Sequence, residues 1–156
     1  LGTGLNILTT DNGQYASGLS LGTYSIAVNH PSFAPDTTHN VVIEEDVVTT
    51  VNFSLTDIAG PMFTLLGQPE STNDTTGPYE VVVEARDFSG IADLHCYYTS
   101  SSSGGPFELP LEATDTPDTY RVLIPGQADG SRVQYWLTGT DVLDISSSVP
   151  TGAPFE

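Results

Sequence analysis

Carboxylates are the chemical groups that this chain holds in greatest supply. The sequence has 20 aspartate and glutamate residues against only 3 basic residues, all of them arginine. Carboxylate oxygens are ligands that calcium prefers, although no acidic stretch here has the spacing of an EF-hand loop. The same acids could instead be solvated turn residues or strand-end caps, and the sequence alone also leaves open a glycosidase-like carboxylate pair. The calcium candidates lie near the ends of expected strands: Asp57, Asp87, Asp141 and Asp144.

The residues that serve most often in nucleophilic or zinc chemistry are few. His30 and His39 flank a proline-containing segment, and their spacing matches no common zinc pattern. Cys96 lies on the same face of its expected strand as Leu94 and Tyr98, which predicts a buried structural thiol. A nucleophilic cysteine would need a nearby cation or helix N-terminus. The chain has no Gly-x-Ser-x-Gly elbow and no phosphate-binding loop. We therefore expect no catalytic residue, no enzyme activity and no cofactor apart from the calcium possibility.

Two aromatic residues are candidates for binding. Tyr97 and Trp136 each alternate with the apolar residues of an expected strand, so both should point away from the core. Exposed aromatic rings on a β-sandwich can stack on sugars or contact a protein partner. The alternative is that they pack against another domain or a long loop.

The elements that must position these residues are predicted to be strands. No segment has a sustained helical apolar stripe, and glycine, proline, serine and threonine recur throughout. In the second half, strands are expected over residues 78–86, 94–98, 119–124 and 132–140, with turns between them. In the first half, alternation predicts strands over residues 5–10, 15–19, 21–30, 40–44 and 47–55.

The chain divides between residues 56 and 61, where an alternating strand ends and a Gly-Pro pair follows. We expect all-β architecture in two consecutive antiparallel β-sandwiches, over residues 1–57 and 58–156. The formal charge of −17 excludes the basic surface that nucleic acid or an anionic membrane requires. A single cysteine excludes an intramolecular disulfide.

The first domain resembles a known family through its turns and aromatics. Residues 11–15 read DNGQY, Gly22-Thr23-Tyr24 follows, and the next strand alternates toward Pro31 and Phe33. This order is similar to the carboxypeptidase regulatory-like domain, a transthyretin-like β-sandwich found beside secreted enzymes. Members usually begin with a GxVxD strand, which is missing before Leu5, so the resemblance implies an N-terminally truncated domain.

The second domain resembles fibronectin-III-like or immunoglobulin-like accessory domains of bacterial secreted proteins, often peptidases. Its most distinctive segments are DFSGI at residues 87–91, IPG at 124–126 and the strand ending in TGTD at 138–141. The two resemblances imply a non-catalytic accessory or spacer segment of a larger secreted or cell-surface protein, appended to a hydrolase. Its partners would be other domains of the same protein, or a protein or glycan surface. The alternative is a carbohydrate- or cell-surface-binding module that uses Tyr97 and Trp136, with or without calcium.

Overall fold

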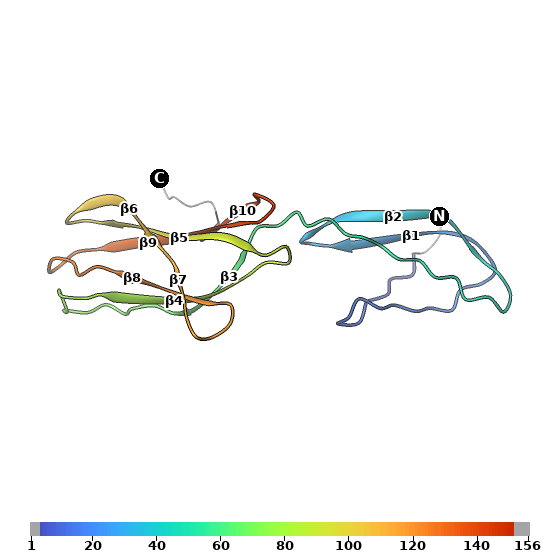
Figure 1. Ribbon diagram of the computed structural model, residues 1–156, viewed down its shortest axis with the longest axis horizontal. Helices are drawn as coiled ribbons and strands as arrows, with labels where there is room; N and C mark the ends of the chain where they lie inside the picture. The colour runs from blue at the N-terminus through green and yellow to red at the C-terminus, as the bar shows by residue number, and fades with distance from the viewer. Residues whose placement is uncertain (1–3, 152–156) are drawn as a thin grey trace. The chain divides into compact units, whose positions relative to one another are not determined.

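The chain is antiparallel β-structure in the computed structural model, which describes residues 4–151 (Figure 1). No helix occurs in this range, and hence none that is long and apolar enough to cross a membrane. The described residues form two compact units. The first unit contains residues 4–30 and 34–55, and the second contains residues 31–33 and 56–151.

The second unit contains two four-stranded antiparallel sheets. One sheet has the order β10-β9-β5-β6 and the other has the order β3-β4-β8-β7, and Figure 1 shows them as two layers. Their strands are β3 (Met62–Gly67), β4 (Tyr79–Arg86), β5 (Ile91–Ser100), β6 (Gly104–Pro110), β7 (Glu112–Ala113), β8 (Thr119–Ile124), β9 (Val133–Asp141) and β10 (Ser146–Val149). This arrangement confirms the all-β sandwich predicted from the sequence.

The core of the second unit lies between these sheets and follows from the alternation of its strands. Val81, Val83 and Ala85 lie on one face of β4 and are fully buried, as expected where successive side chains of a strand point to opposite faces. β5, β8 and β9 contribute five of the seven members of the same cluster, and β4 contributes two. The buried members are Val81, Val83, Cys96, Tyr98, Val122, Ile124 and Leu137. The strands expected over residues 78–86, 94–98, 119–124 and 132–140 are therefore confirmed as β4, β5, β8 and β9.

The described part of the first unit has one two-stranded sheet, formed by β1 (Gly22–His30) and β2 (Phe33–Ile43), of which only Phe33 is assigned to the second unit. The predicted turn at Asn12-Gly13 is confirmed, since the amide of Thr10 donates to the carbonyl of Gln14 across it at 2.8 Å. Tyr24, Ile26 and Val28 are half-buried while their neighbours are exposed, as the alternation predicts.

Three strands expected in the first unit are absent from the structure. Residues 5–10, 15–19 and 47–55 have no strand assignment. Alternation identifies which side chains face inward, but a strand also needs a neighbour whose backbone groups pair with its own. Residues 51–55 still alternate between half-buried and exposed, so the facing was correct and the pairing was not. Any GxVxD-like strand preceding Leu5 lies outside the described residues.

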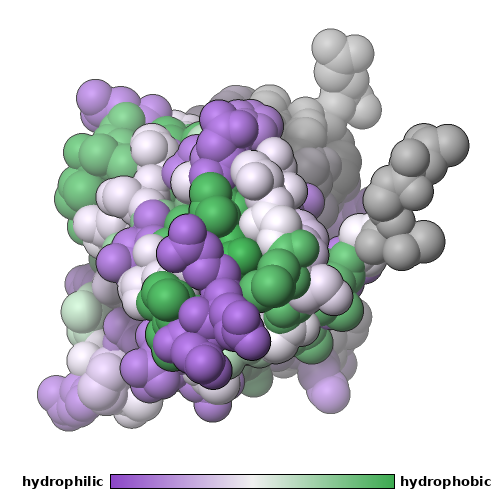
Figure 2. All heavy atoms as spheres, turned by 90° about the vertical axis from the view of Figure 1, so that its right-hand side faces the viewer, coloured by the Kyte–Doolittle hydropathy of each residue, from purple (hydrophilic) through white to green (hydrophobic). Residues whose placement is uncertain are grey.

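The first unit buries little apolar surface. Of its described hydrophobic side chains, only Val41 is counted in the buried core, at 6% exposure. Leu8 and Val48 are more than nine-tenths exposed. Figure 2 shows hydrophobic side chains at the surface, mixed with hydrophilic ones, on the face drawn there. The second unit therefore has the better-packed core.

Candidate functional site

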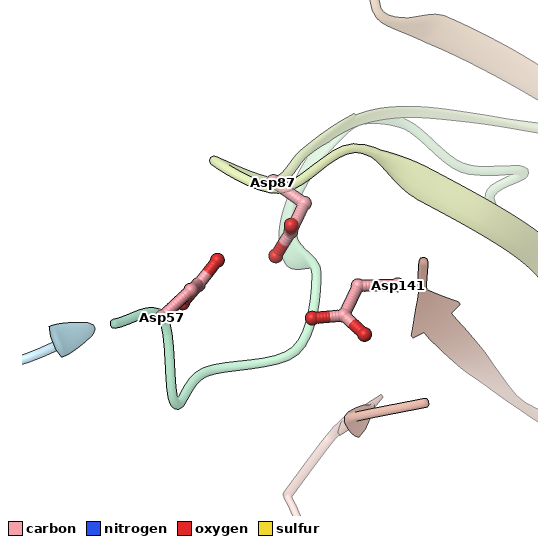
Figure 3. A group of neighbouring side chains, drawn as sticks. All are labelled: Asp57, Asp87 and Asp141. Atoms are coloured by element: carbon pink, nitrogen blue, oxygen red, sulfur yellow. The ribbon is translucent and has the colours of Figure 1, made fainter. Parts of the chain in front are cut away.

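Three of the four aspartates singled out from the sequence lie together in the second unit. Asp57, Asp87 and Asp141 each offer a carboxylate oxygen, and these oxygens lie within 4.8 Å of one another. Figure 3 shows the three side chains pointing toward one another from separate segments. The fourth candidate, Asp144, is exposed in the turn after β9 and is not part of the cluster. We call Asp57, Asp87 and Asp141 the aspartate cluster.

The pairing of β5 with β9 brings two members of the cluster together. Asp87 follows β4, and four residues later the chain enters β5 at Ile91, which pairs with Asp141 at the end of β9. The amide of Val142 donates to the carbonyl of Gly90 at 3.0 Å, which joins the two turns. The turn between β4 and β5 and the turn between β9 and β10 therefore lie beside each other.

Asp57 reaches the cluster through a separate backbone pairing. It forms an isolated antiparallel bridge with Phe33, and the amide of Ile58 donates to the carbonyl of Ser32 at 2.9 Å. The sequence-based division placed Asp57 at the end of the first domain, but these contacts put it in the second unit. The long-range bridge to Phe33 has no signature in the local sequence.

Short-range hydrogen bonds fix the orientation of the carboxylates. Oδ1 of Asp87 accepts from the amides of Ser89 and Gly90 at 2.8 and 3.1 Å. Oδ1 of Asp141 accepts from the amides of Leu143 and Ile145 at 2.8 and 2.7 Å. These are turn contacts of the kind that aspartate makes with its own following backbone. One oxygen of each side chain is held by its own turn, and the other is left to face the cluster.

The oxygens that face the cluster are incompletely satisfied. Oδ1 of Asp57 accepts from the amide of Ala59 at 3.1 Å, but its Oδ2 is buried without a hydrogen-bond partner. The Ser89 hydroxyl lies 2.6 Å from Oδ1 of Asp87 and 3.1 Å from Oδ2 of Asp141. A hydroxyl has one proton to donate, so it can satisfy only one of these two carboxylates at a time.

The chemistry of this donor set is restricted to oxygen. Asp57 is 8% exposed and Asp141 is fully buried, and burying carboxylates together is unfavourable unless a positive charge or hydrogen bonds compensate. Arg86 pairs with Glu84 and Asp118, and Arg121 lies nearest to Glu112, so the ion pairs of these arginines in the described chain lie elsewhere. Oxygen ligands of this kind suit a hard divalent cation.

The two aromatic candidates meet on the outer face of the sheet with the order β10-β9-β5-β6. Tyr97 and Trp136 are directly paired between β5 and β9, and their rings stack with centroids 5.6 Å apart and planes at 15°. Trp136 points away from the core, as predicted, but the residue is only 7% exposed, so it is not an exposed aromatic. Tyr97 covers it and is itself half-buried. Tyr97 is thus the more accessible of the two rings.

The remaining reactive groups of the second unit serve packing and ion pairing. Cys96 is completely buried, and this burial raises the pKa of its thiol to about 12. His95 lies between two carboxylates on the outer face, with Nε2 2.8 Å from Asp93 and Nδ1 2.8 Å from Glu108. The hydrogen bond from His95 lowers the pKa of Asp93 below its ordinary value.

The histidines of the first unit lie in its hairpin. His30 ends β1 and His39 lies within β2, where its Nδ1 is 2.8 Å from the Ser25 hydroxyl. The segment between the histidines, expected as a loop, is mostly strand.

Within residues 4–151, the aspartate cluster is the single group of three or more metal-ligating side chains.

Sequence reasoning identified the members of the cluster but not its geometry. Their selection rested on their positions near strand ends. The unpartnered oxygen of Asp57 and the hydroxyl that Asp87 and Asp141 share were not foreseen. The Asp87-Phe88-Ser89-Gly90 turn contained the one available signal, since an aspartate two residues before a serine often accepts from that serine.

No protein-family model matches the chain, and no curated protein matches it at a significant level.

Proposed function

We propose that the chain is a non-catalytic accessory segment of a larger secreted or cell-surface protein, appended to a hydrolase such as a peptidase. It acts as a spacer and stabiliser for a catalytic domain elsewhere in that protein. The observation that carries the proposal is that the chain's only thiol is buried in the core of the second unit. Cys96 is fully buried between the two sheets, and its pKa of about 12 keeps it protonated at neutral pH.

Two further features support this role. His95 has a carboxylate close to each ring nitrogen, an arrangement that holds the ring in place on the outer sheet. The formal charge of −17 favours solubility and discourages self-association. A spacer requires a packed fold and a soluble surface, and it requires no convergent reactive group.

The test is an assay of the purified chain against peptide and glycoside substrates. We expect turnover at the no-enzyme background. Hydrolysis that is lost in His95→Ala or Cys96→Ser, with the fold intact by circular dichroism, would overturn the proposal. The genomic sequence on either side of this coding region gives an independent test, because we expect a hydrolase domain in the same reading frame.

A second candidate function is recognition of a glycan or a cell surface through Tyr97. The observation in its favour is the rigid stack of this partly exposed ring on Trp136, since stacked aromatics offer a flat apolar face to a sugar ring. A glycan array probed with and without chelator separates the two functions. A spacer is silent under both conditions, whereas a binding module gives signals that Tyr97→Ala removes.

A further inference from the structure

We propose that the aspartate cluster is a calcium site that joins three segments of the second unit. The segments are residues 56–59, the turn after β4 and the turn after β9. The proposal is independent of the accessory role and concerns the second unit alone. It rests on two separate observations, which are the convergence of three carboxylates and an unpartnered buried oxygen among them.

The unpartnered oxygen is the stronger of these observations. Asp57 is only 8% exposed, and its Oδ2 has no hydrogen-bond partner. Buried polar atoms nearly always have a partner, so an orphaned carboxylate oxygen indicates a group that completes it. The Asp57 carboxylate is directed at Asp87 and Asp141 (Figure 3), so the missing partner lies among three carboxylates.

A positively charged partner suits this set of carboxylates best. A neutral donor would satisfy one oxygen but would leave three carboxylates close together in a buried setting. The sequence has no lysine, and Arg86, the arginine next to Asp87, makes its ion pairs with Glu84 and Asp118. A small cation between the three side chains compensates all of them at once.

The geometry and the ligand type favour calcium over other cations. Calcium binds oxygen at about 2.3–2.6 Å, so ligands on opposite sides of one ion lie up to about 5 Å apart. The ligand oxygens here lie within 4.8 Å of one another, which one calcium ion can span. Zinc favours nitrogen and sulfur ligands, and magnesium keeps several waters in a tighter octahedral shell. Backbone carbonyls and water would complete the calcium shell.

The local hydrogen bonds prepare the site for the ion. The turn amides hold Oδ1 of Asp87 and Oδ1 of Asp141, so the side chains are oriented without calcium. Oδ2 of Asp57 has no hydrogen-bond partner. The Ser89 hydroxyl lies closer to Oδ1 of Asp87 than to Oδ2 of Asp141, so Oδ2 of Asp141 is also open to coordination. Calcium would thus bind groups that are already aligned and would reduce their mutual repulsion.

The proposal is tested by calorimetric titration of calcium chloride into the chelator-treated full chain at neutral pH. We expect one site per chain, with a dissociation constant of about 10⁻⁴ M or tighter, and a rise of several degrees in the unfolding temperature. Asp57→Asn should weaken binding at least tenfold. The matched control is Asp144→Asn, which removes the same charge nearby but outside the cluster and should leave the affinity within twofold.

The unfolding temperature of Asp57→Asn distinguishes a cation site from a purely structural network. With chelator, the variant should unfold at the same or a higher temperature than the wild-type chain, because it relieves repulsion among carboxylates. With calcium, the order should reverse. Absence of binding heat and of any thermal shift up to about 10⁻² M calcium would overturn the proposal in favour of a purely structural network. Equal effects of Asp57→Asn and Asp144→Asn, or tighter binding of magnesium than of calcium, would overturn it as well.

Discussion

At the scale of single residues, Cys96 carries the chain's only thiol, and its place in the core decides how that thiol reacts. Burial raises its pKa from 9.0 to about 12, so almost no thiolate forms near neutral pH. We expect the folded chain to react with a disulfide reagent at pH 8 at least about 100-fold more slowly than the chain in guanidinium. The reaction is followed by absorbance. Equal rates in both conditions would show that Cys96 is accessible.

Cys96 also gives an alkaline limit to stability. The folded-state pKa lies above the unfolded value, so the contribution of the neutral thiol is complete below about pH 9 and is lost as the pH rises toward 12. The wild-type chain should therefore lose stability relative to Cys96→Ala across that interval, as measured by urea unfolding at a series of pH values. A difference between the two chains that stays constant with pH would contradict this assignment.

Asp93 behaves in the opposite direction. Its pKa is lowered, mainly by the hydrogen bond from His95, so the ionised form is favoured in the folded chain. The corresponding stability is present above the ordinary pKa of 3.8 and is lost as the pH falls through the lower folded value. The stability difference between wild type and Asp93→Asn should thus shrink on acidification below that range. Carboxyl chemical shifts in an NMR titration would check the direction, and a pKa above 3.8 for Asp93 would refute it.

At the scale of elements, the stack of Tyr97 on Trp136 links β5 to β9 on the outer face of their sheet. Removal of the phenol ring in Tyr97→Ala should expose the indole to water and shift its fluorescence to longer wavelength. The expected loss of stability is about 0.5–1.5 kcal/mol beyond the lost burial, which is the usual contribution of an aromatic pair. Trp136 is the only tryptophan, so the emission reports on this site alone. An unchanged emission maximum would mean that another group covers Trp136.

The segment between Asp57 and β3 is held in place by close backbone packing at Gly60. A Cβ atom at this position would lie 2.7 Å from the backbone carbon of Ser146 and 2.8 Å from the carbonyl oxygen of Ile145. Gly60→Ala should therefore push this segment away from β10 and cost about 1–3 kcal/mol in the free energy of unfolding. The control is Gly18→Ala, where a Cβ would meet nothing within 4 Å. Equal stability of the two variants, measured in urea, would disprove the close packing.

The strands and the site differ in how far the sequence could predict them. β4, β5, β8 and β9 were predictable because each alternates clearly and its inward residues meet a second sheet. Residues 47–55 alternate equally well, yet strand pairing depends on a neighbour that alternation does not specify. The geometry of the candidate site likewise depends on strand pairing that the local sequence does not specify. Asp87 and Asp141 were recognised as acids near strand ends, but their proximity depends on the pairing of Ile91 with Asp141, which is a long-range contact.

At the scale of the whole molecule, the two units differ in how much apolar surface they bury. The second unit has a cluster of seven buried core residues, whereas Val41 is the single core residue assigned to the described part of the first unit. Each fully buried Val, Leu, Ile or Phe side chain contributes about 1.5–3 kcal/mol, so the first unit should be the less stable of the two. Local opening should then occur in β1 and β2 at lower free energy than in β4 and β5.

Hydrogen exchange measured by mass spectrometry tests this difference directly. Peptides from β1 and β2 should exchange at least about 10-fold faster than peptides from β4, β5 and β9, because a difference of 1.4 kcal/mol in opening free energy changes the exchange rate tenfold. Addition of calcium should slow exchange in the turns around Asp87 and Asp141 and leave β1 and β2 unchanged, because the aspartate cluster belongs to the second unit. Equal protection of both units would show that the first unit gains stability from contacts other than apolar burial.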